Sequence, residues 1–395
     1  MTGRLVALDL PGGPEFVDAL RRTWDAGDAA FPVDQRLPDA ARHALFEAIA
    51  PSAVIGPDAG LTTLSGGIPV EVGDALVVAT SGTTGAPRGV VLTHTAVAAS
   101  AVATSARLDV NSGDQWIACL PLSHVGGLSV VTRALHTGSP LTVLPGFDDA
   151  AIRSAVDVHR GDTLISLVAT TLRRTDPTRF RTIVLGGARP PSDLPPNVVT
   201  TYGLTETGSG VVYDGVPLDG VEVRIVSSEI HLRGPMLLRA YRDGSDPTVD
   251  GWFPTGDVGR LDNGGRLVVD GRRGDLIITG GENVWPTPVE EVLVTHPGVT
   301  EVAIVGRPDR EWGARVTALV VPADPRQPPT LDQLRDHAKE SLPAYAAPRE
   351  LVLVDHLPRT PLGKIIRSPI PVDQSSGDGR HDAGSASSGN TTTRS

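Results

Sequence analysis

The sequence contains a single cysteine, Cys119, which excludes an intramolecular disulfide and a cysteine-rich metal site. Aromatic residues make up only 4%, so Val, Leu, Ile and Ala must fill most of the core. No run of about 18 apolar residues that would cross a membrane occurs. The first residues also lack the apolar core of a signal peptide. We therefore expect a cytoplasmic protein with no membrane partner.

An excess of positive charge is also missing. The 35 basic and 46 acidic residues give a formal charge of −11, which argues against nucleic acid as a general partner. Lysine is nearly absent, because only Lys339 and Lys364 occur among the basic residues. The chain therefore uses arginine wherever a generic cation suffices, and its two lysines stand out.

The length predicts two or three domains, and the first half has an α/β pattern. Short apolar runs rich in β-branched residues are typical of buried strands in a parallel sheet. These runs are residues 75–79, 140–144, 163–169 and 181–187. Between strands, residues 94–106 and 123–137 have the composition of helices.

The pattern changes after residue 221. Residues 221–226, 229–234 and 265–271 predict small antiparallel strands. A compact β/α pattern follows, with helices at 287–296 and 330–342 and strands at 301–307, 316–322 and 350–355. Residues 373–395 contain no Leu, Ile, Val or aromatic residue, which predicts disorder. We expect domains at 1–271 and 272–370 and a disordered tail at 371–395.

One stretch has the composition of a phosphate-binding loop. Residues 80–89, TSGTTGAPRG, place four hydroxyls and three glycines after a predicted strand. Side-chain hydroxyls and close backbone N–H groups can surround a polyphosphate. The stretch is not a Walker A loop, because G-K-[ST] is missing. Taken alone, it is also compatible with a Gly/Thr turn between two strands.

Four further motifs follow in order. They are TYGLTETG at 201–208, GWFPTGDVGRLD at 251–262, GRRGDLIITGGENVWPTPVEE at 271–291 and PRTPLGKIIR at 358–367. The ordered set resembles the adenylate-forming family of acyl-CoA synthetases. The resemblance implies a large multi-layer α/β N-terminal domain and a small, mobile α+β C-terminal domain. It also implies ATP, Mg²⁺ and coenzyme A as cofactors and a small-molecule carboxylic acid as substrate.

The resemblance implies a nucleotide-binding role for the residues that match family motifs. These are Thr80, Ser81, Gly82, Thr83, Thr84, Gly85, Arg88, Gly186, Gly187, Ala188, Tyr202, Gly203, Thr205 and Asp257. The loop would bind the β- and γ-phosphates, and Tyr202 would lie against the adenine. Asp257 would accept hydrogen bonds from both ribose hydroxyls, as a carboxylate does well.

Other matches would act on the reacting groups. Glu206 and Thr83 would hold Mg²⁺, which prefers oxygen ligands. Arg272 would anchor ribose and phosphate. Lys364 would lie between the substrate carboxylate and the α-phosphate and stabilise the charge that develops there. Coenzyme A would approach the loop Gly280–Gly281.

Two positions depart from the family pattern. Arg88 stands where the loop usually carries lysine, and it should still bind phosphate. Gly274 stands where the hinge often carries Asp or Lys. Glycine absorbs large backbone changes, so we expect domain rotation to be retained.

The segment 119–131, CLPLSHVGGLSVV, resembles the border of the acyl pocket in acyl-CoA synthetases. It predicts that His124 and Gly127 contact the substrate; a core histidine bonded to backbone is the alternative. Ser123 and His124 are neighbours and no G-x-S-x-G motif occurs, which excludes an α/β-hydrolase site.

Within the family the chain looks most like the o-succinylbenzoate–CoA ligases of menaquinone biosynthesis. The second carboxylate of that acid would need a polar partner such as His124, Ser209 or an arginine. Another aryl or medium-chain acyl-CoA ligase is the alternative, and a non-catalytic nucleotide-binding relative is a second class. A homodimer is a further expectation.

Overall fold

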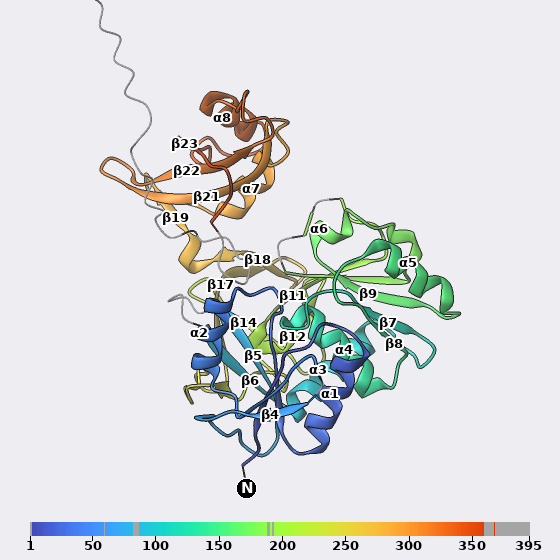
Figure 1. Cartoon of the computed structure of the whole chain (residues 1–395). Coiled ribbons are helices and arrows are strands. Elements are labelled where there is room, and N and C mark those ends of the chain that lie inside the picture. The colour runs from blue at the N-terminus through green and yellow to red at the C-terminus, as the bar shows by residue number, and fades with distance from the viewer. Residues whose placement is uncertain are drawn as a thin grey trace, which may run out of the picture.

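The computed structural model describes residues 2–58, 60–81, 87–187, 190–191, 193–358 and 367, with Ser81 described by its backbone alone. The chain forms a large N-terminal α/β domain and a smaller C-terminal domain, drawn in orange and brown in Figure 1. The fold expected from the sequence is therefore confirmed.

The first sheet of the large domain has seven strands in the order β16-β6-β5-β2-β1-β3-β4. They are β1 (Leu5–Leu8), β2 (Ala29–Pro32), β3 (Ala53–Ile55), β4 (Leu61–Thr63), β5 (Asp74–Ser81), β6 (Pro87–Thr93) and β16 (Ala240–Tyr241). β5 is parallel to β2 but antiparallel to β6. The expectation that strand 75–79 lies in a parallel sheet is thus confirmed on the β2 side and wrong on the β6 side. Residues 82–86 alone separate β5 from β6, too few for a parallel crossover.

The second sheet also has seven strands, in the order β13-β12-β11-β10-β9-β7-β8. They are β7 (Gln115–Ala118), β8 (Leu141–Val143), β9 (Thr163–Leu167), β10 (Thr182–Leu185), β11 (Val198–Leu204), β12 (Ser209–Tyr213) and β13 (Val216–Pro217). The strands from β8 to β11 are parallel, which confirms the strands expected near 140–144, 163–169 and 181–187. β8 is only half-buried, because it lies at the edge of the sheet.

Helices α3 (His94–Arg107) and α4 (Val125–Thr137) pack against each other and contact β5 and β7, one strand from each sheet. Both expected helices are confirmed, with α4 beginning two residues later. Side chains along a strand alternate between faces. Trp116 and Leu164 join the core that α4 shares, whereas Ile117 and Ile165 face α5 (Asp149–Val158). The remaining helices are α1 (Pro14–Asp25), α2 (Asp39–Ile49) and the short α6 (Ala169–Leu172).

The third sheet is antiparallel, as expected, and carries two of the predicted site residues. Its strands are β14 (Glu222–Val226), β15 (Glu229–Arg233), β17 (Phe253–Leu261) and β18 (Leu267–Arg272). Because β17 and β18 pair in register, Asp257 lies directly opposite Arg272. Two residues far apart in the sequence are thereby neighbours.

The small domain has a core of its own around five strands and two helices. The elements are β19 (Ile277–Thr279), β20 (Glu282–Val284), α7 (Pro286–Leu293), β21 (Val299–Asp309), β22 (Gly313–Pro322), α8 (Leu331–Lys339) and β23 (Glu350–Leu353). Every element expected between 287 and 355 is confirmed. Thr330 and Gln333 form a capping box that fixes the start of α8.

A single 3₁₀ turn, Arg273–Asp275, connects β18 to β19, the first strand of the small-domain sheet. Its Gly274 does not have a positive φ, and a Cβ added there would meet no atom within 4 Å. A non-glycine residue would therefore fit at this position. Gly271 has no such freedom, because an added Cβ would lie 2.7 Å from the Trp285 ring of the small domain.

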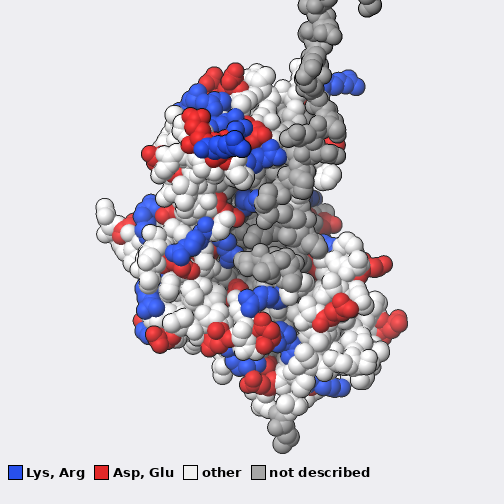
Figure 2. Space-filling view, turned by 90° about the vertical axis from the view of Figure 1, so that its left-hand side faces the viewer, with Lys and Arg blue, Asp and Glu red and all other residues white. Residues whose placement is uncertain are grey.

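Charges of both signs are mixed on the face shown in Figure 2, over both domains. The described part of that face has no extended patch of one sign. Among the described residues, no helix has the length and apolarity needed to span a bilayer.

Candidate active site

Asp257 connects two other residues that the sequence assigns to the nucleotide site. The Tyr202 hydroxyl donates to Oδ2 of Asp257 at 2.8 Å, and Nε of Arg272 donates to Oδ1 at 2.8 Å. The Asp257 side chain is buried, and its own backbone N–H donates to Oγ1 of Thr255 at 3.0 Å. Three residues from β11, β17 and β18 therefore form one hydrogen-bonded cluster.

The charges in this cluster keep Arg272 ionised and Tyr202 protonated. Burial lowers the pKa of Arg272, but the negative charges of Asp257 and Glu206 more than reverse this and leave the pKa raised. Burial raises the pKa of Tyr202, and the Asp257 carboxylate raises it further. Tyr202 is thus a hydrogen-bond donor at neutral pH. The predicted metal ligand Glu206 lies in the turn directly after β11, the strand that carries Tyr202.

Replacing Asp257 by asparagine should weaken ATP binding about tenfold, because a hydrogen bond to a charged group contributes about 1.5–3 kcal/mol. Asparagine also lacks the negative charge that Arg272 faces. Calorimetric titration with ATP measures the effect. Asp262→Asn, in the exposed turn of the same hairpin, is the control and should bind ATP as the native chain does. Unchanged affinity in Asp257→Asn would contradict a nucleotide role for this cluster.

Glu206 lies in a 3₁₀ turn, Thr205–Thr207, and its Oε1 accepts the Tyr241 hydroxyl at 3.0 Å. Arg88 lies beside the same tyrosine, with its guanidinium carbon 3.9 Å from the ring centroid. The Thr80 hydroxyl contacts the Arg88 carbonyl at 3.4 Å across β5 and β6. The start and end of the predicted phosphate loop are thereby fixed close to Glu206.

These groups fit a magnesium ion that arrives with a nucleotide. Among the described residues, no cluster of three or more His, Cys, Asp or Glu side chains could hold a metal. Magnesium is usually bound through one or two carboxylates together with substrate phosphates. A single carboxylate, Glu206, next to a phosphate loop meets that requirement.

Arg133 is a further residue of interest that the sequence analysis did not single out. It lies on α4, is 2% exposed, and its guanidinium carbon is 4.6 Å from the centroid of Trp116. Nη2 lies 3.4 Å from Oγ of Ser209, while no described residue accepts a hydrogen bond from Nε or Nη1. Burial lowers the pKa of Arg133, against a smaller opposing influence of Tyr213. A buried guanidinium without a carboxylate is costly and points to an anionic ligand.

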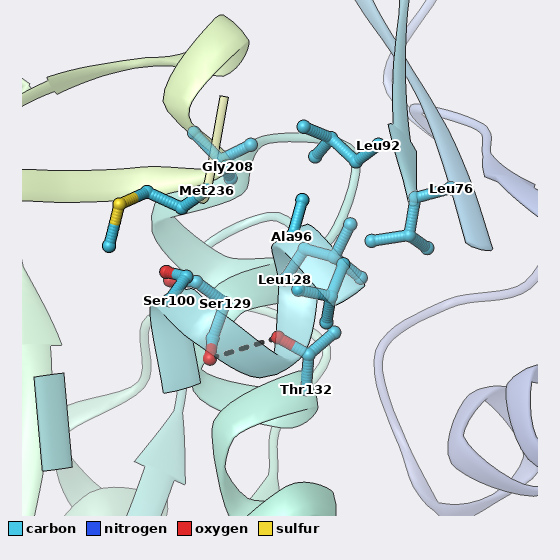
Figure 3. A pocket seen from close by; sticks show the side chains of 11 residues that line it. Leu76, Leu92, Ala96, Ser100, Leu128, Ser129, Thr132, Gly208 and Met236 are labelled. Atoms are coloured by element: carbon cyan, nitrogen blue, oxygen red, sulfur yellow. Dashed lines mark hydrogen bonds between the residues drawn. The ribbon is translucent and has the colours of Figure 1, made fainter. Parts of the chain in front are cut away.

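A small cavity is lined by residues next to Ser209 and Arg133 in the sequence, but not by these two residues themselves. It is lined by Gly208 and Thr132, the neighbours of Ser209 and Arg133, and by Ser100, Ser129 and Met236 among others (Figure 3). In Figure 3 the Thr132 hydroxyl donates to the Ser129 carbonyl, at 3.3 Å. The volume of about 10 Å³ holds about one water, so this cavity is not by itself a pocket for an aromatic acid.

His124 stands at the N-cap of α4 and has partners that the sequence did not reveal. Its Nε2 lies 3.4 Å from Nη2 of Arg36 and 3.8 Å from Oδ2 of Asp34. Burial lowers the pKa of His124; the Asp34 carboxylate opposes this and Arg36 adds to it. His124 is therefore neither bonded only to backbone nor in contact with the nucleotide cluster. Gly127 packs tightly, because an added Cβ would lie 2.4 Å from the Leu120 carbonyl oxygen.

Among the described residues, the predicted glycines Gly203, Gly186 and Gly280 also pack against protein, whereas a Cβ added at Gly281 would meet nothing within 4 Å. An added Cβ would lie 2.2 Å from the Ser209 carbonyl oxygen at Gly203 and 2.8 Å from the Thr201 hydroxyl at Gly186. Gly187 has φ +88°, a left-handed conformation that favours glycine. The loop Gly280–Gly281 joins β19 to β20 with φ of +59° and +85°. Whether these glycines contact cofactors stays a prediction.

Several predicted residues lie outside the described residues: Gly82, Thr83, Thr84, Gly85, Ala188 and Lys364. The tail 371–395 lies outside them too. Of the residues that sequence analysis missed, Arg133 had a detectable signal. It is the one charge in the run Leu128–Leu135, whose other residues are apolar or carry hydroxyls, and this made a buried or ligand-binding guanidinium one option. Tyr241, Asp34 and Arg36 had none, because Glu206 and His124, which they contact, come from distant segments.

Comparison with known proteins supports the same family. Residues 69–284 match the model described as AMP-binding enzyme, and residues 288–364 match the AMP-binding enzyme C-terminal domain. The "Probable 2-succinylbenzoate--CoA ligase" of Mycobacterium tuberculosis (strain ATCC 25618 / H37Rv) is 41% identical over 321 residues, which cover 75% of this chain and 83% of that protein. The 2-succinylbenzoate–CoA ligase of Bacillus cytotoxicus is 36% identical over 332 residues, 74% of this chain and 68% of that protein.

Solved structures that resemble this chain support the same family. The o-succinylbenzoate CoA synthetase of Bacillus subtilis in complex with its acyl-adenylate intermediate matches with a TM-score of 0.84 and 28% identity, over 94% of this chain and 89% of that one. The same enzyme with ATP and magnesium ion matches with a TM-score of 0.82 and 28% identity, over 93% and 89%. The chain therefore belongs to the AMP-binding enzyme family, in which the relatives named here are all 2-succinylbenzoate–CoA ligases.

Proposed function

We propose that this chain ligates o-succinylbenzoate to coenzyme A through an acyl-adenylate, with ATP and Mg²⁺. The names of its relatives support the reaction and the substrate. The single structural observation that favours an acid with two carboxylates is Arg133, a fully buried guanidinium bonded only to Ser209 among the described residues. A monocarboxylic acid would leave this charge without an anionic partner.

Arg133 and Ser209 would bind the carboxylate on the aromatic ring. A guanidinium donates in a planar fork that matches a carboxylate, and the hydroxyl adds a third donor. His124 is a poor alternative partner for that group. It lies at the other end of α4, about 13 Å away along the helix axis at the usual rise per residue. Side chains around the cavity beside Gly208 would have to move apart to admit the acid.

In the first step, an oxygen of the succinyl carboxylate attacks the α-phosphorus of ATP, and pyrophosphate leaves. Asp257 and Arg272 would hold the ribose, and the Lys364 ammonium would stabilise the charge between the two reacting groups. Bound Mg²⁺ neutralises phosphate charge, and Glu206 and Thr83 would hold it. The chain thus contributes mainly orientation and electrostatic stabilisation.

In the second step, the sulfur of coenzyme A attacks the acyl carbon, AMP leaves and the thiol proton passes to solvent. We propose that the small domain, 272–370, rotates about the turn at Gly274 between the steps, so that Lys364 leaves and the loop Gly280–Gly281 approaches. Separate hydrophobic cores in the two domains support this. β18 ends at Arg272, in agreement with a boundary there.

Pyrophosphate release with a panel of acids tests the proposal. We expect ATP- and acid-dependent release with o-succinylbenzoate at least ten times faster than with its analogue lacking the ring carboxylate. Thioester formation should follow on adding coenzyme A. Faster release with benzoates or medium-chain fatty acids would favour another acyl-CoA ligase. Absence of pyrophosphate release with every acid tested would favour the non-catalytic class.

A further inference from the structure

Tyr241 contacts both the predicted metal ligand and the predicted phosphate-binding cation. Its hydroxyl donates to Glu206 at 3.0 Å, and its ring lies 3.9 Å from the guanidinium carbon of Arg88. The phenol O–H is the donor in this pair, because an ionised carboxylate can only accept. No motif in the sequence analysis includes this residue.

The position of Tyr241 is fixed by its backbone. β16 pairs antiparallel with β6, with Tyr241 opposite Val90, on the strand that follows the phosphate loop. The next residue, Arg242, anchors the segment by donating to the carbonyls of Ile49 and Pro69, both at 3.0 Å. The Tyr241 N–H donates to the Ser245 carbonyl at 2.8 Å, which closes the turn that follows. The backbone at Tyr241 is therefore anchored to β6 and, through Arg242, to Ile49 and Pro69.

Arg88 is held less firmly. Its side chain is 41% exposed. Nη2 lies 3.1 Å from Oγ of Ser245 and 3.4 Å from Oδ2 of Asp243, which is itself 60% exposed. Exposed ion pairs contribute little, about 0–1 kcal/mol. Stacking over a tyrosine ring is a contact that a planar guanidinium makes better than an ammonium. Phosphate oxygens would compete successfully for this guanidinium.

We propose that Tyr241 is a positioning residue for the metal–nucleotide site, whose hydroxyl orients the Glu206 carboxylate and whose ring holds Arg88 until ATP binds. The inference rests on the proposed function, since it takes ATP and a divalent cation as ligands. The hydroxyl restricts Glu206 to one orientation before the metal arrives, which lowers the entropy lost on binding. The ring keeps the cation at the phosphate loop without a strong ion pair that ATP would have to break.

Calorimetric titration with ATP, once with Mg²⁺ and once with EDTA, tests the role of the hydroxyl. The ratio of the two dissociation constants measures how much the metal adds to the affinity for ATP. The measurement needs neither an acid substrate nor turnover. Tyr241→Phe keeps the ring and should reduce this ratio about twofold to tenfold, the size expected for the cost of ordering one carboxylate side chain on binding. Its affinity for ATP in EDTA should stay within about twofold of the native value. A native-like ratio in Tyr241→Phe would overturn the proposal.

Two further variants separate the ring from the hydroxyl and from general damage. Tyr241→Leu lacks both groups, and we expect it to bind ATP in EDTA more tightly than Tyr241→Phe, because Arg88 no longer has to leave the ring. Equal affinities of the two variants would overturn the role of the ring. Tyr345→Phe, in the small domain, is the matched control and should leave both constants unchanged. Failure of the native chain to bind ATP with Mg²⁺ would instead count against the proposed function.

Discussion

The Arg133→Met variant is expected to require about a hundredfold more o-succinylbenzoate for half-maximal pyrophosphate release, while its folded state becomes more stable. Removing one partner of a buried charge pair costs about 2–5 kcal/mol in binding, and a hundredfold change lies within this range. Methionine has a similar length and no charge. The variant should discriminate little between o-succinylbenzoate and the analogue that lacks the ring carboxylate.

The expected gain in stability also follows from the burial of the Arg133 charge. Without ligand, Arg133 is a fully buried charge, with Nε and Nη1 unpaired among the described residues. Replacing even a buried ion pair by apolar side chains is often stabilising by about 1–4 kcal/mol, and an unpaired charge lacks the attraction that offsets its burial. Urea unfolding of the ligand-free variant measures this. Stability that falls together with activity would mean that Arg133 supports the fold rather than the substrate.

Arg181→Met is the matched control, because Arg181 is an arginine whose carboxylate partner is present. Its Nη2 lies 2.7 Å from Oδ2 of Asp114, whose side chain is 3% exposed. Removing Arg181 leaves a buried carboxylate unpaired, so this variant should lose about 3–5 kcal/mol of stability. Its Michaelis constant for the acid should not change. Opposite signs of the two stability changes would distinguish a ligand-binding arginine from a structural one.

The second large effect is expected at Lys364. Replacing it by alanine should slow adenylate formation by about 10²–10³, the size typical of losing one oriented electrostatic donor. Thioester formation from preformed acyl-adenylate should continue at close to the native rate, because the small domain has by then rotated away. The two half-reactions are measured separately, by pyrophosphate release and by consumption of synthetic adenylate. Equal loss of both rates would contradict domain rotation.

Lys339 is the natural control, since it is the other lysine of the chain. It lies at the end of α8, 3.3 Å from Oδ1 of Asp336, on an exposed surface. Lys339→Ala should leave both half-reactions unchanged. Lys364→Arg should restore little activity, because a guanidinium fork is broader than the compact ammonium. Full rescue by arginine would mean that position 364 needs only a positive charge.

Sequence patterns predicted the secondary structure where the apolar periods are strong, but they predicted no element before residue 75, where the structure has α1, α2 and β1 to β4. The small domain from 287 to 355 matches in every element. The parallel arrangement was predicted where apolar runs alternate with helices, between β8 and β11. It was wrong between β5 and β6, because a short continuous apolar run does not distinguish a strand of a buried hairpin from a buried parallel strand. Only residues 82–86 separate the two strands, and so short a connection requires an antiparallel pair whatever its composition.

The sequence by itself determined the family, the order of the motifs and the contrast between abundant arginine and two lysines. Those properties are local or compositional, so a single chain displays them. Only the tertiary structure paired Asp257 with Tyr202 and Arg272, and Glu206 with Tyr241. It alone showed that Arg133 is buried without a carboxylate. Burial and partnership depend on which distant segments meet, and sheet register decides this rather than any local pattern.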